Sequence, residues 1–453
     1  MLQTINPTTG EPLETYEEHG REEIDRRLAK AAAAFPAWRE RSFDERAAVL
    51  RAAAQVLADR SAALSRLMTL EMGKPIEASK AEIDKCAWVC RHYADHAAEY
   101  LARRDVATDA TRSYVRFDPL GPVLAIMPWN FPFWQVFRFA APSLMAGNVG
   151  LLKHAESVLG SARAIEDVFR AAGLPDGGFQ TLQVRHTAVA DIITDDRVRA
   201  VTLTGSVRAG GAVAAAAGKA IKKSVLELGG SDPFVVLEDA DVDRAAEIGA
   251  VARMINSGQS CIAAKRFIVH EKVADRFIEG FVEHIRRMQV GDPLDPGTQI
   301  GPLARRDLLE SLADQVRRSV NAGARAALGG GPLDRPGFFF DPTVLVQVRP
   351  EHAAGSEETF GPVAAVLVVR DRGEAVRVAN ASEYGLGASL WTGDLLEAER
   401  IAARIDAGSV FVNGLVKSDP RLPFGGVKRS GYGRELSVEG IREFVNAKTV
   451  WIA

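Results

Sequence analysis

Apolar residues recur every three to four positions between residues 22 and 102, in a stretch rich in Ala, Leu, Arg and Glu. That spacing is typical of amphipathic helices whose apolar face packs against a core. The pattern is broken at Met72-Gly-Lys-Pro75, where glycine and proline favour a helix end. We therefore predict about three scaffold helices in this part of the chain.

The pattern changes from Gly121 onward, where short apolar runs alternate with helical stretches. Parallel strands that are buried on both faces have such continuous apolar runs, so the alternation predicts βαβ units. The first series of predicted strands covers residues 122–127, 149–152, 179–184, 198–203 and 224–228. A second series covers residues 234–237, 266–270, 363–369, 386–391 and 409–412, with helices at 241–255, 273–288, 304–321 and 395–405.

The number of domains follows from the length of the chain. Its 453 residues are more than one hydrophobic core usually supports. Together with the two series of βαβ units, this length predicts an α/β fold with two parallel-sheet domains.

Composition and charge exclude several classes of function. Hydrophobic residues make up 47% and charged residues 25%, and the net charge of −3 leaves no surplus of positive charge for nucleic acid. The first ten residues lack a basic patch followed by an apolar core, and no apolar run approaches the roughly 20 residues that span a bilayer. We therefore predict a soluble, cytoplasmic protein with no nucleic-acid or membrane partner.

The chain has three cysteines, Cys86, Cys90 and Cys261, which are too few for a disulfide framework and fit a reducing compartment. Cys86 and Cys90 are four residues apart in a predicted helix, so we assign them to a partly buried helix face. No compact set of further ligands accompanies them, and we predict no metal site.

A thiol and a carboxylate stand in two glycine-containing segments. Cys261 ends the segment Asn256-Ser-Gly-Gln-Ser-Cys261, and Glu227 opens the segment Glu-Leu-Gly-Gly230. A thiolate attacks carbonyl carbons, and a carboxylate activates the water that releases the acyl group. The pair therefore indicates covalent catalysis through a thioester, with an inert thiol and a structural carboxylate as the alternatives.

Polar residues follow three predicted strands: Asn130, then Lys153 with Glu156, then Gly205 with Ser206. Ligands bind outside the carboxyl ends of the strands of an open parallel sheet, so these residues mark a dinucleotide site. Free N–H groups at the helix that starts after Gly205 suit a phosphate. The glycines do not follow the G-x-G-x-x-G pattern, so a purely structural helix start remains the alternative.

The side chains of Lys153 and Glu156 bear on the choice of cofactor. Lys153 can donate hydrogen bonds to ribose hydroxyls, and Glu156 can accept them. A carboxylate there also repels a 2′-phosphate, so we predict NAD as the preferred cofactor, with NADP as the second choice. The alternative is that the two side chains form surface ion pairs.

Seven segments, in order, resemble the motifs of the aldehyde dehydrogenase superfamily, and the resemblance covers nearly the whole chain. They are Pro128-Trp-Asn-Phe-Pro132, Lys153 to Glu156, Gly205 to Gly210, Glu227-Leu-Gly-Gly230, Gly258-Gln-Ser-Cys261, Glu357-Glu-Thr-Phe-Gly-Pro362 and Pro423-Phe-Gly-Gly-Val-Lys-Arg-Ser-Gly431. The resemblance implies a Rossmann-like NAD-binding domain (residues 1–105 and 120–228), a catalytic domain (229–432) and an arm of oligomerisation segments (106–119 and 433–453).

The resemblance also implies residue roles. Cys261 would be the nucleophile, Glu227 the general base and Asn130 the oxyanion donor. Cofactor contacts are implied for Trp129, Lys153, Glu156, Gly205, Ser206, Glu358 and Phe360. The implied reaction is the NAD(P)-dependent oxidation of an aldehyde to a carboxylic acid. A CoA-acylating relative would not need Glu227, and a non-enzymatic relative would have lost Cys261 or Asn130.

Within the superfamily, the chain most resembles succinate-semialdehyde dehydrogenases, through the run from Asn130 to Arg138 and through Lys-His-Ala after the next strand. Arg138 lies in an apolar helix eight positions after Asn130, where its guanidinium suits the tail carboxylate of a short semialdehyde. Trp134 and Ser418 are further candidates for substrate contact, together with Lys417. The alternative for Arg138 is an interdomain or surface ion pair.

The sequence does not fix the identity of the aldehyde substrate. Some succinate-semialdehyde dehydrogenases carry a second arginine shortly before the nucleophile, where this chain has Ile255. Phe131, Phe133 and Phe424 are candidates for the walls of the tunnel that admits the aldehyde. Such residues belong more often to the hydrophobic core. A general aliphatic, betaine or glutarate semialdehyde dehydrogenase is the alternative, because one methylene changes binding by only about 1 to 3 kcal/mol.

Residues 113–118 and 449–453 have the pattern of strands with no obvious partner within a domain. By the same resemblance such strands pair between subunits, which implies a homodimer or homotetramer. An exposed strand edge would otherwise favour aggregation.

Overall fold

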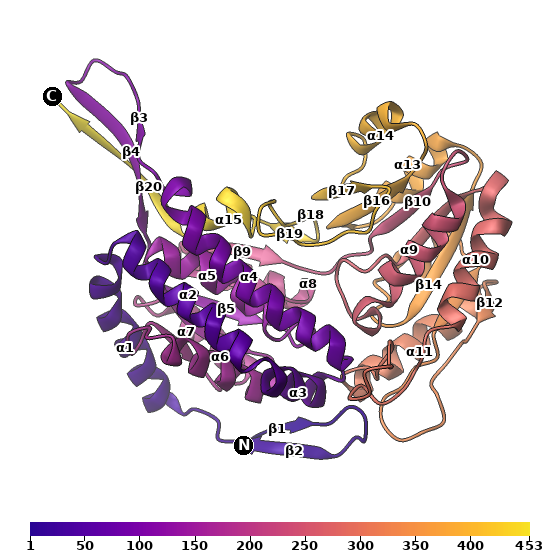
Figure 1. Cartoon of the computed structure of the whole chain (residues 1–453), viewed down its shortest axis with the longest axis horizontal. Helices are drawn as coiled ribbons and strands as arrows, with labels where there is room; N and C mark the ends of the chain where they lie inside the picture. Colours follow the sequence, from indigo (N-terminus) through magenta and orange to yellow (C-terminus); the bar gives the residue numbers. More distant parts are fainter.

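Two β-sheets, each covered by helices, organise the chain, and a narrow three-stranded arm projects from one end (Figure 1). The computed structural model describes all residues, 1–453. The predicted α/β fold with two mainly parallel sheets is confirmed.

The first sheet has the strand order β19-β9-β8-β5-β6-β7, and only β19 runs antiparallel to its neighbour. Its strands are β5 (Pro122–Met127), β6 (Val149–His154), β7 (Phe179–Thr181), β8 (Ala200–Thr204), β9 (Lys223–Glu227) and β19 (Gly431–Tyr432). The five strands predicted between residues 122 and 228 all form, with small shifts at their ends. Since β19 comes from near the C-terminus, the chain returns to this sheet after building the second one.

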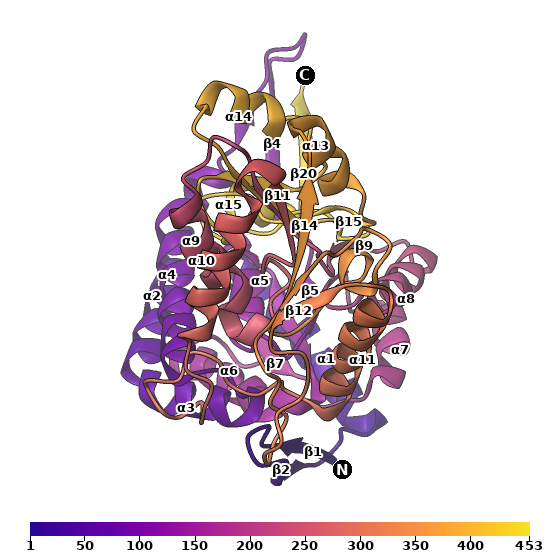
Figure 2. The same cartoon turned by 90° about the vertical axis from the view of Figure 1, so that its right-hand side faces the viewer.

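Helices cover both faces of the first sheet. They are α1 (Arg21–Arg39), α2 (Phe43–Asp59), α3 (Ser61–Met72), α4 (Ile76–Tyr100), α5 (Trp134–Ala146), α6 (Leu159–Ala171), α7 (Val189–Thr194) and α8 (Val207–Lys219). The chain leaves β5 and β8 in opposite directions along the sheet, so right-handed crossovers put α5 and α8 on opposite faces (Figure 2). Helices α2, α3 and α4 form an outer layer over α5 and α6.

Four helices precede residue 102, where we predicted about three. Ser42 and Glu45 form a capping box that starts α2 as a separate helix. The predicted break after Met72 is confirmed, because Gly73 ends α3 in the left-handed conformation with a φ of 80°. This capping box therefore divides one long helical stretch into α1 and α2, which accounts for the fourth helix.

The second sheet has the strand order β12-β13-β14-β11-β10-β16-β17, and only β12 is antiparallel to its neighbour. Its strands are β10 (Pro233–Val236), β11 (Arg266–His270), β12 (Arg325–Leu328), β13 (Thr343–Val346), β14 (Val363–Val369), β16 (Gly387–Trp391) and β17 (Ser409–Val412). The associated helices are α9 (Val242–Met254), α10 (Ala274–Arg286), α11 (Arg306–Asn321), α12 (Ala353–Ser356), α13 (Arg372–Asn380) and α14 (Leu395–Ala402). Strands β12 and β13 and helices α12 and α13 were not predicted.

The arm consists of β3 (Arg104–Asp105), β4 (Arg112–Pro119) and β20 (Val445–Ile452). Both strands predicted here form, and although we predicted no obvious partner for them within a domain, each is the partner of the other. They pair with each other antiparallel along their whole length, from Arg112 opposite Ile452 to Pro119 opposite Val445. The two segments meet because the C-terminal end of the chain, after α15 (Ser437–Arg442), runs back past the first sheet.

The remaining elements are short. They are β1 (Leu2–Ile5) and β2 (Pro12–Tyr16), which form a hairpin, β15 (Tyr384–Gly385) paired with β18 (Val427–Lys428), and the 3-10 turns η1 (Glu156–Val158), η2 (His186–Ala188), η3 (Ile255–Gly258) and η4 (Glu271–Val273). None of the helices combines the length and the apolar character that crossing a membrane requires.

Each sheet has its own hydrophobic core. One cluster of 63 buried residues surrounds the first sheet, and separate clusters of 22, 12 and 12 buried residues lie around the second. The first cluster also contains Leu386, Phe424 and, near the C-terminus, Leu436, Ile441, Phe444 and Val445, and the division of the chain at residue 229 stays a prediction.

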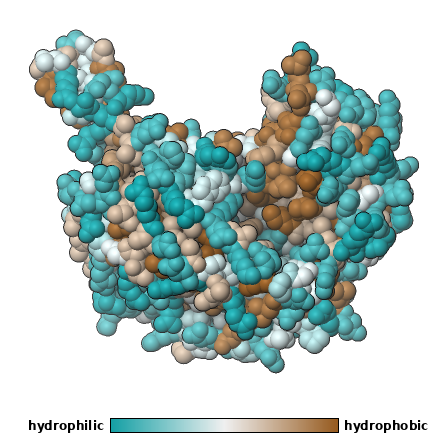
Figure 3. Space-filling view, viewed as in Figure 1, coloured by the Kyte–Doolittle hydropathy of each residue, from teal (hydrophilic) through white to brown (hydrophobic).

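The side of the second sheet that faces the arm is apolar. Figure 3 shows a band of hydrophobic side chains (brown) running from α14 down into the hollow between the arm and the second sheet. Leu395, Leu396 and Val412 are among the large hydrophobic residues that are exposed, and Val412 ends β17, the edge strand of this sheet. A free strand edge beside exposed apolar surface is a common site of association.

Candidate active site

A cavity of about 320 Å³ lies where the first sheet's helices meet the second sheet. Its walls come from α4, the start of α5, the turn that leads to Cys261 and the loop of residues 416–424. Four residues predicted from separate parts of the sequence line it: Trp134, Arg138, Cys261 and Ser418. The fold therefore brings the predicted nucleophile and the predicted substrate residues into one cavity.

The phenylalanines proposed as tunnel walls divide into two groups. Phe131 and Phe424 line the cavity. Phe133 does not, because its side chain is fully buried in the core, where it stacks near Phe137. Ile255, which occupies the place of a second arginine, is also in the cavity wall.

The turn before Cys261 has an unusual backbone. After α9 ends, Asn256 and Ser257 adopt φ values of 56° and 55°, in the left-handed region that such residues rarely occupy. Gly258 is also left-handed, and a Cβ there would collide with the carbonyl of Gly361. Strained backbone of this kind persists only where the surroundings hold it, and it is concentrated at functional sites.

Two buried cations hold this turn in place. Arg253 donates to the carbonyl oxygens of Gly258 at 2.6 Å and Gly361 at 2.8 Å. Lys265 donates to those of Ser260 at 2.7 Å and Cys261 at 2.5 Å. Neither cation was singled out from the sequence, although both lie within eight residues of Cys261. Their hydrogen bonds fix the backbone that carries the thiol.

Burial raises the pKa of the Cys261 thiol to about 12, against the opposing effect of Lys265 and Arg138. The thiol is therefore protonated at neutral pH in the protein alone. Its activation depends on a nearby base or on positive charge that arrives with a ligand.

This pKa predicts how Cys261 reacts with iodoacetamide in the absence of ligands. Because only the thiolate reacts, the alkylation rate should rise about tenfold for each pH unit between pH 7 and 10. Mass spectrometry of the modified peptides measures this rate. Cys86 and Cys90 are internal controls, because both are fully buried in α4 and should stay unmodified. A plateau of the Cys261 rate below pH 9 would contradict the assigned pKa.

Asn130 lies directly against the nucleophile turn. Its amide nitrogen Nδ2 donates to the carbonyl of Gln259 at 3.1 Å, and its own carbonyl accepts a hydrogen bond from Asn256 at 2.8 Å. The amide has two N–H groups, so one remains for an oxygen held near Cys261. The oxyanion role of Asn130 stays a prediction, and this geometry is compatible with it.

The loop that carries Asn130 is braced from two sides. Glu82 of α4 accepts hydrogen bonds from the backbone N–H groups of Phe133 and Trp134, both at 2.9 Å, and it pairs with the buried ammonium of Lys74. His154 makes a ring-nitrogen contact with the carbonyl of Pro132 at 2.9 Å. Burial lowers the pKa of His154 to about 4, so the ring is neutral at physiological pH.

Glu227 ends β9, and its side chain is only 2% exposed. Neither carboxylate oxygen has a hydrogen-bond partner within the protein. Burial, and then repulsion from Glu435, raises the pKa of Glu227 well above its ordinary value. A carboxyl group with a raised pKa and free oxygens suits a general base that awaits water or substrate. This role too stays a prediction.

The guanidinium of Arg138 already has interaction partners within the protein. Its guanidinium forms a buried ion pair with Glu435, donates to Thr204 at 3.4 Å, and lies 4.4 Å from the ring centroid of Phe424. Arg138 lines the cavity, but its charge is balanced by Glu435, so the alternative of an internal ion pair describes its contacts in this structure. Its role as a carboxylate clamp, completed by Lys417 or Ser418, stays a prediction.

Another cation of the cavity wall, Lys85, was not singled out from the sequence. Lys85, in α4, donates from Nζ to the hydroxyl of Ser418 at 2.8 Å, and Nζ lies 4.3 Å from the ring centroid of Trp134. The sequence pattern could have indicated this residue. Glu82 and Lys85 lie near Cys86 and Val89, which are on the buried face of a helix that we assigned to the scaffold. Charged residues on a buried stripe need a structural or functional reason.

A separate cavity of about 360 Å³ lies beside α7 and α8, next to β5 and β8. Its walls are mainly apolar, with Lys153 and Arg208 among the polar residues. Ser206 caps α8, so the first N–H groups of this helix stand beside the cavity. An apolar pocket next to a helix N-terminus fits the adenosine and phosphate groups of a dinucleotide.

Two carboxylates predicted to contact riboses have partners of their own. Glu156 pairs with Arg185 at 3.3 Å, and Arg185 also pairs with Glu18 at 3.1 Å. Glu358 accepts a hydrogen bond from the backbone of Gly230 at 3.0 Å and lies 3.7 Å from Lys265. Lys265 therefore links the predicted ribose contact to the turn that carries Cys261.

The two aromatic residues assigned to the cofactor are neighbours. Trp129 and Phe360 meet edge to face, with ring centroids 5.7 Å apart. Gly205, in the turn before α8, donates its backbone N–H to the carbonyl of Glu227 at 2.9 Å. This bond joins the predicted phosphate loop to the predicted base.

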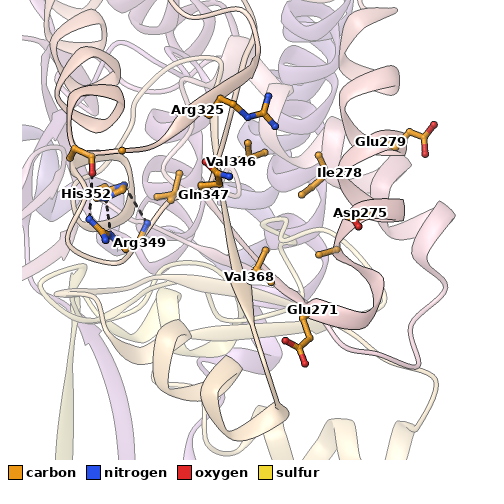
Figure 4. Close-up of a pocket in the computed structure, with 14 residues that line it drawn as sticks. Glu271, Asp275, Ile278, Glu279, Arg325, Val346, Gln347, Arg349, His352 and Val368 are labelled. Carbon is orange, nitrogen blue, oxygen red and sulfur yellow. Dashed lines mark hydrogen bonds between the residues drawn. The ribbon is translucent and has the colours of Figure 1, made fainter.

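A larger groove, of about 790 Å³, lies elsewhere, between α10 and the strands β13 and β14. Arg349 and His352 at its rim are hydrogen-bonded to each other at 3.2 Å (Figure 4). The groove contains no cysteine and none of the predicted site residues. We therefore do not assign the chemistry to it.

Comparison with known proteins supports the resemblance. The Aldehyde dehydrogenase family matches residues 1–450. A probable succinate-semialdehyde dehydrogenase [NADP(+)] of Synechocystis sp. is 52% identical over 452 residues, which cover all of both chains. A succinate-semialdehyde dehydrogenase [NADP(+)] of Mycobacterium avium is 50% identical over all of this chain and 96% of its own.

Solved structures agree in fold. The succinic semialdehyde dehydrogenase of Streptococcus pyogenes, in complex with NADP+, superposes with a TM-score of 0.97 at 38% identity, over 100% of both chains. The Synechocystis and Mycobacterium avium relatives are named for NADP(+), and the Streptococcus pyogenes enzyme was solved with NADP+, so these three do not support the predicted preference for NAD. The match along almost the entire sequence and fold shows that this chain belongs to the aldehyde dehydrogenase family.

Proposed function

We propose that the protein oxidises succinate semialdehyde to succinate, with NADP or NAD as the electron acceptor. The observation that carries this proposal is the identity of 50% or more, over the full chain, to relatives named for that substrate. The cavity beside Cys261 supports it, because its walls include the cations Lys85 and Arg138, which suit a substrate with a negative tail.

The proposed chemistry uses three residues of the site. The Cys261 thiol gives up its proton to solvent and its sulfur bonds to the aldehyde carbon, while the Nδ2 group of Asn130 and the Cys261 N–H stabilise the oxygen that becomes negative. A nicotinamide cofactor, held by the predicted cofactor residues, would supply the acceptor for the hydride that leaves this carbon. Glu227 then removes a proton from the water that attacks the thioester, which releases the acid and restores the thiol.

A panel of four aldehydes tests the substrate: succinate semialdehyde, glutarate semialdehyde, butanal and betaine aldehyde. We expect the highest kcat/KM for succinate semialdehyde and the next highest for glutarate semialdehyde, which is longer by one methylene. A kcat/KM for butanal equal to that for succinate semialdehyde would overturn the proposed substrate, while the family assignment would stand.

For the cofactor, we infer that both NADP and NAD are accepted and that Glu156 and Arg185 set their ratio. The names of the relatives favour NADP, whereas the carboxylate of Glu156 disfavours a 2′-phosphate. Arg185 lies 3.3 Å from Glu156 and neutralises part of this repulsion. The pair is partly exposed, so the remaining effect is modest.

The variant Glu156→Gln should therefore raise kcat/KM for NADP, relative to NAD, by about tenfold. The substitution removes the negative charge and frees Arg185 to bind the 2′-phosphate. Steady-state kinetics with both cofactors measure the ratio. Glu17→Gln, at an exposed residue of the same region, is the control and should leave the ratio unchanged. An unchanged ratio in Glu156→Gln would rule out this carboxylate as the determinant.

We further propose that the chain forms a homodimer or homotetramer through the arm and the free edge of β17. The apolar hollow beside β17 and the exposed Trp451 and Ile452 at the end of β20 support this proposal. Light scattering on the wild type and on Trp451→Asp tests it, with the variant expected to shift towards the mass of one chain.

A further inference from the structure

Lys85 differs from the other buried cations of the substrate cavity in having no counter-ion. Lys74 is paired with Glu82, and Arg138 is paired with Glu435. The one hydrogen bond of Lys85 goes to the neutral hydroxyl of Ser418. Lys417 also lines the cavity, but it is exposed, so water solvates its charge. The half-buried charge of Lys85 is the one that an anion in the cavity would compensate.

The surroundings of Lys85 leave donors available for such an anion. The ammonium has three N–H groups, of which Ser418 takes one, and the ring of Trp134 lies 4.3 Å from Nζ. The Ser418 hydroxyl accepts from Lys85 and can donate its own proton to a second acceptor. Lys85 and Ser418 together therefore offer two neighbouring donors, which suits the two oxygens of a carboxylate.

The electrostatics of Lys85 also favour an anionic ligand. Burial, and then the positive charge of Arg138 on α5, lower the pKa of Lys85 to about 8. Cys86 and Glu82 on its own helix, and Asp419 in the loop beyond Ser418, act in the opposite direction. Asp419 is already paired with Arg421 at 2.7 Å. A carboxylate beside Lys85 would stabilise the charged form and raise this pKa again.

We propose that Lys85, with Ser418 as its partner, binds the tail carboxylate of the substrate and selects short aldehydes that carry a negative charge at the far end. Arg138 contributes less to binding of the carboxylate, because Glu435 balances part of its positive charge. This inference rests on the proposed function, because it names the residue that would recognise the succinate-semialdehyde tail.

The test compares Lys85→Met and Lys85→Arg with the wild type, on succinate semialdehyde and on butanal, which has the same chain length and no charge. In Lys85→Met, kcat/KM for succinate semialdehyde should fall about 50-fold, mainly through KM, while that for butanal should change less than about threefold. Lys85→Arg should recover most of the loss. Lys80→Met, on the exposed face of the same helix, is the control and should match the wild type.

The pH dependence gives a second readout. In the wild type, KM for succinate semialdehyde should rise above about pH 8, as Lys85 loses its proton, while KM for butanal should stay level. In Lys85→Arg the rise should be absent, because a guanidinium keeps its charge over this range. The same pH profile in both proteins would overturn the proposal.

The outcomes separate this inference from the proposed function. If the wild type does not prefer succinate semialdehyde over butanal, the proposed substrate fails. If it does prefer it, but Lys85→Met loses activity equally on both aldehydes, the Lys85 proposal fails alone. A specific loss in Lys417→Met, with no such loss in Lys85→Met, would assign the carboxylate to the exposed lysine. Thermal melting by circular dichroism shows whether each variant is folded.

Discussion

Replacing Cys261 by alanine is expected to lower kcat for oxidation of succinate semialdehyde by at least about 10⁴-fold. Without the sulfur no covalent bond forms to the aldehyde carbon, and no other thiol can replace it. Cys86 and Cys90 are fully buried in α4, where burial raises the pKa of both thiols far above the neutral range. The measurement is the absorbance of the reduced cofactor under saturating substrate.

The matched control for this variant is Cys86→Ala, which removes a thiol from the same protein but leaves Cys261 in place. It should keep most of the activity, although the small cavity that it creates lowers the stability. Rapid quenching followed by mass spectrometry should detect an acyl adduct on the peptide that contains residue 261 in the wild type. A fully active Cys261→Ala variant would end the thioester mechanism.

The strands of the two sheets could be predicted because they are buried on both faces. Residues 122–127, 266–270, 363–369 and 409–412 were predicted with the bounds that the structure has. Their apolar runs are unbroken, and this is the pattern that a covered parallel sheet imposes. Strand β12 was missed at the sheet edge, where it is partly exposed, and its neighbour β13 was missed although its residues are buried. An edge strand leaves a weaker hydrophobic signal.

The positions of the motifs could be predicted, but the pairing of their side chains could not. Arg138 and Glu435 are far apart in the sequence, and nothing in either segment indicates that they meet. Arg185, the partner of Glu156, lies after the next strand. The prediction of the cofactor therefore did not take the positive charge of Arg185 into account. Such contacts depend on tertiary packing, which residue patterns along the chain do not encode directly.

Lys85 shows where the sequence pattern was informative but was not used. The amphipathic helix α4 buries Ile83, Cys86 and Val89, and Lys85 stands beside them on the inner side. A charged residue in that position is uncommon unless it has a partner or a ligand. A helix with the pattern of a scaffold can therefore also contribute a charged residue to a cavity wall.

The variant Glu227→Gln is expected to lower the steady-state rate by about 10³-fold, while the first turnover remains fast. The amide cannot take a proton from water, so the thioester accumulates on Cys261 after one equivalent of reduced cofactor has formed. Stopped-flow absorbance should show a burst close to one equivalent per chain, followed by a slow phase. Glu247→Gln, at an exposed residue of α9, is the control and should behave as the wild type.

The pH profile adds an independent check on Glu227. Burial and the neighbouring Glu435 raise its pKa well above the ordinary value, so the carboxylate form, which is the base, increases as the pH rises from neutral. The wild-type steady-state rate should therefore climb with pH, and this rise should be absent in Glu227→Gln. If the variant loses the burst and the steady-state rate together, Glu227 acts before acylation and its assignment to thioester hydrolysis is wrong.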